Sequence, residues 1–407
     1  MKAYLKKGGT AVLDQVLFSG SNFLLNLFLV KLLTPTDYGL FGSLYSLYLL
    51  TIIVFGAVWL EPYNYYKNRP GDTRQYTALN ASFTNLLLLL ALGLTVVGWL
   101  AHAYLFVYAS YTLTTCVIYF YKRHFLSILS VGRSLYISVL YFVLISAGLL
   151  LLNYVIPQSL FNAFLVLNGA TILSVLPVVL SNQQFRTVLY RPLAWLQFRD
   201  MMVQQKKYAF HCVSSGILSW VPSNIYFILL PLFYSSELNA YFKALQNISL
   251  PITHLNIAIV SLLVPFFIRS ANPHKLIQQV SGLFVLIPVL YLLVILGLSG
   301  SIEHYVYNDK YDLKPLWLCA LLLGIIPEIT ANVFKAFFRS IDRPELVTRI
   351  NLGNACVALL CSYFVYRFGL PGVLTSYIVV NVFNLLNSVR SYRFETRHRK
   401  KTSLELV

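Results

Sequence analysis

The sequence predicts an all-α polytopic membrane protein with twelve transmembrane helices and both termini in the cytoplasm. Of its 407 residues, 58% are hydrophobic and only 11% are charged, and the mean hydropathy is +0.69. One soluble core cannot bury that much apolar surface. Stretches of about 20 mostly apolar residues, the length that crosses a bilayer, also recur along the whole chain. These two observations define the fold class.

The apolar stretches give the predicted spans. We expect helices rather than strands, because an open strand would leave backbone groups unpaired in lipid. The opening "MKAYLKKGG" runs directly into a full-length span, so we expect no cleavable signal. The predicted spans are 11–33, 38–61, 77–99, 101–121, 134–153, 160–181, 208–233, 238–268, 277–299, 315–338, 346–366 and 369–391.

Basic residues set the orientation of these spans. The net charge of +17 could indicate a nucleic-acid partner, but most of the 31 lysines and arginines, Lys122 and Arg123 among them, fall in alternate connecting segments and in the two termini. An excess of basic residues on the cytoplasmic side is typical of membrane proteins. We therefore place both termini in the cytoplasm and expect no nucleic-acid partner.

Chemical motifs are few. The five cysteines fall inside spans without paired ligand spacing, so we interpret them as buried thiols and expect no metal site. The sequence has no phosphate-binding loop, H-E-x-x-H motif or nucleophile elbow. We expect no cofactor and no enzymatic activity. The driving force is expected to be an ion gradient, of protons or sodium, or a mass-action flow of substrate.

The longest inner loop, "NQQFRTVLYRPLAWLQFRDMMVQQKKY", divides the spans six and six. Its mixture of aromatic and basic residues suits a segment at the inner membrane surface, beside anionic lipid. We interpret it as a linker. The predicted organisation is an N-terminal lobe (1–184), a cytoplasmic interfacial linker (185–206), a C-terminal lobe (207–392) and a basic cytoplasmic tail (393–407).

Polar residues share one face of the first span. At about 100° per residue, Gln15, Ser19, Asn22 and Asn26 fall within a stripe roughly 60° wide. They could line a cavity and bind substrate, or they could bond neighbouring helices. Asp14 lies off this stripe near the inner end, where it could reach water or the lysines at positions 6 and 7.

Two spans of the second half repeat the pattern. In the eighth span Lys243, Asn247 and His254 share a face, and Pro251 and Pro265 are expected to break the helix. Lys243 could bind an anionic substrate or extend to the outer surface. In the seventh span His211 lies on a comparable stripe, as a substrate contact or as a histidine bonded to a neighbour.

The tenth span carries charges on one face. Glu328, Asn332, Lys335 and Arg339 recur at helical spacing, and Glu328 falls near the middle of the bilayer. A charge there costs about 2.5 to 3.5 kcal/mol on insertion scales, so it should face protein or water. We predict that Glu328 and Lys335, together with Asp14, couple transport to an ion or organise a cavity. A purely structural role, as a partner of a neighbouring group, is the alternative for Glu328.

Two stretches resemble a known family. "LDQVLFSGSNFLLNLFLVKLLTPTDYGLFGSLYSLYLL" resembles the opening of bacterial polysaccharide flippases, within the multidrug/oligosaccharidyl-lipid/polysaccharide exporter superfamily. "FKAFFRSIDRPELVTRINLGNACVALLCSYFVYRFGLPGVLTSYIVV" resembles that family's passage from the tenth to the twelfth span, above all in Asp342-Arg343-Pro344 and in 368–372. Unlike some members, this chain has few Arg or Lys deep in its first two spans.

The resemblance implies two six-helix lobes around a central cavity, working by alternating access in a bacterial inner membrane. It implies a lipid-linked oligosaccharide as substrate, a polyprenyl diphosphate carrying an O-antigen or exopolysaccharide unit. Lys243 would meet the diphosphate, and Gln15, Asn22 and Asn26 would meet the headgroup. Membrane lipids and polysaccharide assembly proteins are the partners that such a role implies.

Three other functions remain open on the sequence. The same fold could serve a small-molecule or cation exporter. A membrane polysaccharide polymerase or ligase would need converging groups on the outer face, where the candidates are Glu303, His304, Asp309 and Asp312. A scaffold for an assembly complex would leave the polar stripes unexplained.

Overall fold

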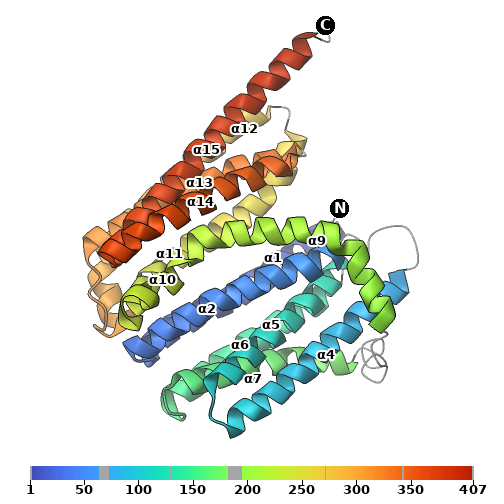
Figure 1. The fold of residues 1–407 in the computed structure, drawn as a ribbon, viewed down its shortest axis with the longest axis vertical. Coiled ribbons are helices and arrows are strands. Elements are labelled where there is room, and N and C mark those ends of the chain that lie inside the picture. The colour runs from blue at the N-terminus through green and yellow to red at the C-terminus, as the bar shows by residue number, and fades with distance from the viewer. Residues whose placement is uncertain are drawn as a thin grey trace. The chain divides into compact units, whose positions relative to one another are not determined.

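The computed structural model describes residues 2–63, 73–128, 130–181, 195–270, 272–341 and 343–405. Within these ranges every element of regular secondary structure is a helix (Figure 1). The chain divides into two compact units, Met1–Gly216 and Ile217–Val407, and each is described by itself. The predicted all-α class is confirmed.

The first unit is a bundle of long helices. α1 packs against α6, α4 packs against α5, and both α5 and α6 pack against α7. Its elements are α1 (Lys2–Leu32), α2 (Pro35–Phe55) with a π-helical continuation η1 (Gly56–Leu60), α4 (Thr73–Leu100), α5 (Tyr104–Ser127), α6 (Val131–Tyr154), α7 (Leu160–Ser181) and the greater part of α9 (Trp195–Asn224).

The second unit is organised around α13. α11, α12 and α15 each pack against α13, and α15 also packs against α14. Its further elements are α10 (Tyr226–Phe233), α11 (Ser236–Arg269), α12 (Pro273–Ser301) with the π-helical η2 (Ile302–Val306), α13 (Pro315–Ser340), α14 (Pro344–Phe368) and α15 (Leu370–Glu405). Half of the apolar window of α13 is buried, as expected of a central helix.

Tight turns separate consecutive helices where the spans adjoin most closely. The Thr34 hydroxyl accepts a hydrogen bond of 3.1 Å from the backbone N–H of Asp37 and so caps α2. Between α14 and α15, Gly369 has φ +60°, a conformation that glycine adopts without steric cost. One turn later, a Cβ on Gly372 would lie 2.0 Å from the carbonyl oxygen of Phe364. The α14–α15 corner therefore requires glycine twice.

Nine helices in the described part of the chain are long and apolar enough to cross a membrane, and the bent pair α9 and α10 would make a tenth. The protein is thus a multi-pass membrane protein. α5 and α11, predicted as the fourth and eighth spans, are helical from 104 to 121 and over 238–268 respectively, but they are not among these nine. α5 carries many polar residues, which lower its hydropathy, and part of α11 falls outside the residues whose side chains the structure describes. The count of twelve spans stays a prediction.

Proline acts differently in two helices. The seventh span bends by 49° between Asn224 and Tyr226, shortly after Pro222. α11, in contrast, continues as one helix of 34 residues through Pro251 and Pro265, so the expected break was wrong. A proline removes a single backbone hydrogen bond, and neighbouring turns can keep the helix continuous.

α15 extends past the ends of α13 and α14, and contacts fix this extension to its own unit (Figure 1). The Tyr392 hydroxyl and His274 Nδ1 of α12 share a hydrogen bond of 2.6 Å, and the Tyr392 ring centre lies 5.4 Å from that of Phe337. Glu395 is 7% exposed and its Oε1 lies 3.7 Å from Nε of Arg343. The predicted tail is therefore helical and anchored as far as Glu395.

Other sequence predictions have different outcomes. The proposed linker (185–206) lies outside the described residues as far as residue 194, and from Trp195 it forms the start of α9. Asp342 of the family motif also lies outside them. Among the cysteines, Cys116 and Cys361 are buried as expected, whereas Cys356 is exposed on α14.

Candidate functional site

The polar stripe of α1 runs from the exposed Gln15 to Asn26 in the buried interior of the first unit. Gln15 is exposed and its Nε2 donates to Ser19 Oγ over 3.1 Å. Asn26 is 1% exposed, and its Nδ2 donates to the backbone carbonyl of Asn22 over 2.7 Å. The Asn22 Oδ1 atom is buried without a hydrogen-bond partner in the described residues. The stripe thus presents an unused amide acceptor beside Asn26.

Five tyrosines gather next to this stripe, on α2, α5 and α6: Tyr45, Tyr48, Tyr111, Tyr119 and Tyr141. The Tyr45 and Tyr48 rings stack at 5.3 Å, and Tyr48 stacks on Tyr111 at 5.1 Å. Phe18 of α1 lies 5.4 Å from Tyr119 and 5.3 Å from Tyr141. The Tyr45 hydroxyl also interacts with Asn26. Phenols and amides are therefore in contact within this unit.

Asp14 occupies a buried polar cluster that sequence reasoning did not anticipate. It is 2% exposed, and its Oδ1 lies 2.6 Å from Nζ of Lys122 on α5. The hydroxyls of Ser138 and Ser134, both on α6, donate to Oδ1 and Oδ2 over 2.5 and 2.8 Å. Lys122 also donates to Ser138 and lies 4.5 Å from the Phe18 ring centre.

This cluster joins three helices through one carboxylate. From the sequence, we expected Asp14 to contact water or the N-terminal lysines. We also assigned Lys122 to a loop on the cytoplasmic side. In the structure both are interior residues, and each compensates the charge of the other. A buried carboxylate that pairs with a cation and accepts two hydroxyl hydrogen bonds has its charge compensated by protein groups instead of water.

Lys243 is the predicted residue whose burial stands out in the second unit. It is 3% exposed, its Nζ lies 5.2 Å from the ring centre of Phe227 on α10, and it donates to Gln246 Oε1 over 3.3 Å. It therefore does not extend to the outer surface. Asn247, one turn away, is also buried, and His254 is half-buried two turns further on. The three predicted residues share α11, as expected.

Glu328 meets a neutral partner. The Tyr377 hydroxyl of α15 donates to Glu328 Oε2 over 2.6 Å. Lys335 lies close enough to attract Glu328 electrostatically, but its own hydrogen bond, of 3.0 Å, goes to Oδ1 of Asn351 on α14. Glu328 and Lys335 thus connect α13 to α15 and α14, respectively. They do not form a direct ion pair within the described residues.

The remaining predicted residue, His211 of α9, is exposed in the structure. The described residues bring together Asn22 with Asn26, and Glu328 with Lys335. They do not bring Asp14 into contact with the stripe amides, because Asp14 turns toward α5 and α6.

Sequence reasoning also missed a buried hydroxyl and amide network between α4, α5 and α7. Asn168 of α7 is fully buried, and its Nδ2 donates to Thr95 Oγ1 over 2.7 Å and to Ser110 Oγ over 2.9 Å. Its Oδ1 accepts from Thr114 over 3.2 Å. Serine and threonine in an apolar helix give little pattern, so no periodicity identified this network.

Comparison with solved structures shows which fold this is. The chain superposes on an inward-facing multidrug resistance MATE family transporter of the MOP superfamily with a TM-score of 0.72, at 13% identity, over 97% of this chain and 99% of the other. It superposes on the lipid II flippase MurJ, in an inward closed conformation, with a TM-score of 0.68, at 12% identity, over 96% and 87%.

A third match is a point mutant of the Vibrio cholerae MATE transporter VcmN, with a TM-score of 0.57, at 12% identity, over 98% and 97% of the two chains. No protein-family model and no curated protein matches the sequence. At these identities the likeness shows the fold alone. This protein has the two-lobe helical fold of MATE transporters and of MurJ.

Proposed function

We propose that this protein is a flippase that moves polyprenyl-diphosphate-linked oligosaccharide units across a bacterial inner membrane by alternating access. The likeness in fold to a lipid II flippase and to multidrug transporters supports transport in general. The observation that carries the choice of substrate is the tyrosine cluster beside Asn22 and Asn26. Aromatic faces together with amide groups are what a sugar requires, since it presents both apolar C–H faces and hydroxyls.

Lys243 supports an anionic headgroup. A buried lysine ammonium attracts an anion strongly, because little water competes for it there. Its Nζ lies against the Phe227 ring and donates to the neutral amide of Gln246 at 3.3 Å. A diphosphate oxygen is a stronger acceptor than an amide oxygen, so it would take over this hydrogen bond when the substrate enters.

Glu328 and Asp14 would serve ion coupling in different ways. Glu328 accepts a hydrogen bond from a phenol, so it could gain a proton or bind a sodium ion without an ion pair having to break first. Asp14 already has Lys122 as its counter-charge, so its protonation would leave a buried cation uncompensated. We therefore assign the coupling step chiefly to Glu328, with Lys335 as a charge that tunes it.

The outer segment offers little to an enzyme. His304 pairs with Asp309 at 3.0 Å, Glu303 accepts from the backbone N–H of Leu313 at 3.3 Å, and Asp312 lies 3.8 Å from Lys314. Each acidic group is engaged locally, so no nucleophile and general base converge among these described residues. This supports a non-enzymatic role over a polymerase or ligase.

A reconstituted flipping assay tests the proposal. The purified protein in liposomes would receive a polyprenyl-diphosphate oligosaccharide labelled on one leaflet, and exchange between leaflets would be measured with and without an imposed pH or sodium gradient. Gradient-dependent exchange is expected. Efflux of a fluorescent organic cation without lipid-linked sugar exchange would favour the exporter of the same fold instead.

A further inference from the structure

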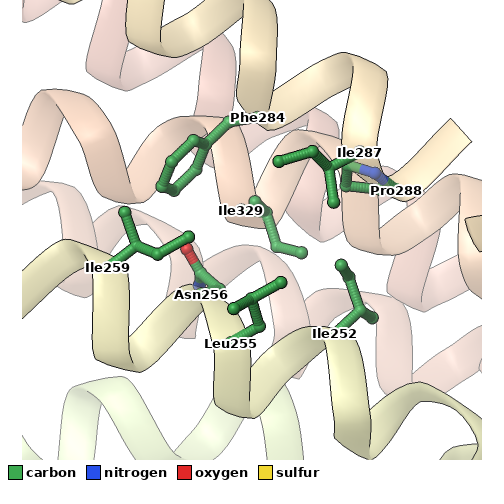
Figure 2. Close-up of a pocket in the computed structure, with 8 residues that line it drawn as sticks. All are labelled: Ile252, Leu255, Asn256, Ile259, Phe284, Ile287, Pro288 and Ile329. Atoms are coloured by element: carbon green, nitrogen blue, oxygen red, sulfur yellow. The ribbon is translucent and has the colours of Figure 1, made fainter. Parts of the chain in front are cut away.

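An apolar pocket lies inside the second unit, between α11, α12 and α13. Figure 2 shows its lining side chains, of which seven are apolar and one is an amide. The residues are Ile252, Leu255, Asn256, Ile259, Phe284, Ile287, Pro288 and Ile329. On α11 they recur at the spacing of one helix face. None of them belongs to the transport residues described above.

Asn256 is the feature of this pocket that needs an explanation. It is 7% exposed, and its Oδ1 is buried with no hydrogen-bond partner in the described residues. Figure 2 shows the carboxamide oxygen turned away from the α11 ribbon, among the apolar side chains. A buried polar atom without a hydrogen-bond partner lowers the stability of the folded protein. Such an acceptor in a pocket therefore indicates that a ligand supplies the donor.

Pro288 lies in the same wall of the pocket. It lies inside α12 and has no N–H, so it cannot donate the hydrogen bond that would normally reach the carbonyl of Phe284, four residues earlier. Both Phe284 and Pro288 line the pocket. The pocket therefore combines one amide oxygen acceptor with an aliphatic surface.

The chemistry of the lining decides between possible donors. An ammonium group would donate well, but the lining residues that the structure describes include no carboxylate to balance it, and an unpaired buried cation is costly. A hydrocarbon or acyl chain would fit the walls but would leave Asn256 Oδ1 unsatisfied. A water molecule would meet seven apolar side chains, whereas a well-held buried water needs two to four polar partners. A neutral hydroxyl group on an apolar chain suits both the amide and the walls.

The size of the pocket limits how the ligand is held. Its empty volume, including the part that is open at its mouth, is about 220 Å³. The enclosed part is therefore smaller, and a chain must leave through the open side. We propose that the second unit binds the hydroxyl end of a neutral aliphatic or isoprenoid alcohol. The hydroxyl would donate to Asn256 Oδ1, and the chain would lie against Ile259, Phe284 and Ile329.

Photolabelling in lipid nanodiscs tests this site, which does not depend on the proposed flippase activity. The probes are a ten-carbon aliphatic alcohol with an internal diazirine and the methyl ether of the same compound. Labelled peptides are mapped by mass spectrometry. The alcohol should label α11, α12 or α13 about three to ten times more strongly than the ether, the range that one hydrogen bond provides.

Three variants complete the test. Asn256→Leu removes the acceptor at similar side-chain volume. It should reduce labelling by the alcohol probe to the level of labelling by the ether probe. Ile329→Trp fills the pocket and should abolish labelling by both probes. Leu290→Trp is the control, because Leu290 is 52% exposed on α12 and does not line the pocket, and it should label as the wild type does.

Equal labelling by the two probes in the wild type would overturn the assignment of a hydroxyl ligand and leave an apolar chain as the occupant. Undiminished labelling of folded Ile329→Trp would overturn the site itself. Gel filtration and thermal unfolding of each variant separate loss of the pocket from loss of the fold.

Discussion

Lys122 and Asp14 form an ion pair of 2.6 Å in which the two side chains are only 7% and 3% exposed. Removing one partner of such a pair leaves the other charge buried, at a cost of about 3 to 5 kcal/mol, whereas replacing both can be nearly neutral. Asp14→Asn and Lys122→Met should therefore each lower the unfolding temperature strongly. The double variant should recover much of the loss.

This double-mutant cycle uses thermal unfolding in detergent as its measurement. Strictly additive losses in the two single variants and the double variant would refute the coupling. The pair Arg123 and Glu61 is the control, since its atoms approach to 3.1 Å but both side chains are nearly half exposed. The double-mutant cycle for Arg123 and Glu61 should give a coupling energy of less than about 1 kcal/mol.

Glu328→Gln should fold normally and lose the dependence of transport on an ion gradient. Glutamine can still accept a hydrogen bond from Tyr377, so the contact between α13 and α15 survives without the charge. The measurement compares exchange rates with and without a gradient. A variant that shows wild-type gradient dependence would exclude Glu328 from coupling, and one that fails only by low membrane abundance would make it structural.

Lys243→Ala should abolish flipping of a diphosphate-linked substrate, whereas Lys243→Arg should keep part of it, because arginine retains the charge near Phe227. Lys243→Met is the matched control for the volume of the chain without the charge. It should resemble Lys243→Ala in transport and the wild type in stability. Wild-type transport by all three variants would remove Lys243 from the substrate site.

Asn168→Leu should destabilise the first unit by about 1 to 3 kcal/mol, since Thr95, Ser110 and Thr114 lose a shared partner in a buried network. Thermal unfolding measures the change. Asn162→Leu is the control on the same helix, because Asn162 makes its side-chain bond, of 2.8 Å to the carbonyl of Pro157, at an exposed site. A smaller effect at Asn168 than at Asn162 would contradict the importance of the network.

Gly372→Ala should sharply reduce the yield of folded protein, because the new Cβ would lie 2.0 Å from a backbone carbonyl that cannot move aside without displacing α14. The control is Gly282→Ala in α12, where a Cβ would meet nothing within 4 Å. Alanine favours helices over glycine, so that variant should be as stable as the wild type or more stable. Comparable yields of the two variants would contradict a rigid corner.

Helix positions were predictable from the sequence, and partners were not. Apolar length located α13 within a few residues, and helical spacing correctly placed Glu328 and Lys335 on one face. Tyr377, 49 residues further along, could not be assigned to Glu328 because that contact depends on how α13 packs against α15. Periodicity describes one helix at a time.

The treatment of Lys122 shows a second limit. Counting basic residues in loops assigned it to the cytoplasmic surface, because it begins the run Lys122-Arg123 at the end of a predicted span. The counting rule holds on average over segments and has no information about a single side chain. Here α5 continues to Ser127, one further turn and more, and that extension keeps Lys122 in the interior.

The anchoring of Tyr392 and Glu395 has a practical consequence for handling this protein. A C-terminal truncation placed where the last apolar stretch ends, near Arg390, would delete both residues and detach the N-terminal ends of α12 and α14 from α15. Fusion partners and purification tags belong beyond Glu405, where the described helix has already ended. Poor expression of such a shortened chain would then result from loss of the Tyr392 and Glu395 contacts that hold the helices together, and not from a failure of membrane insertion.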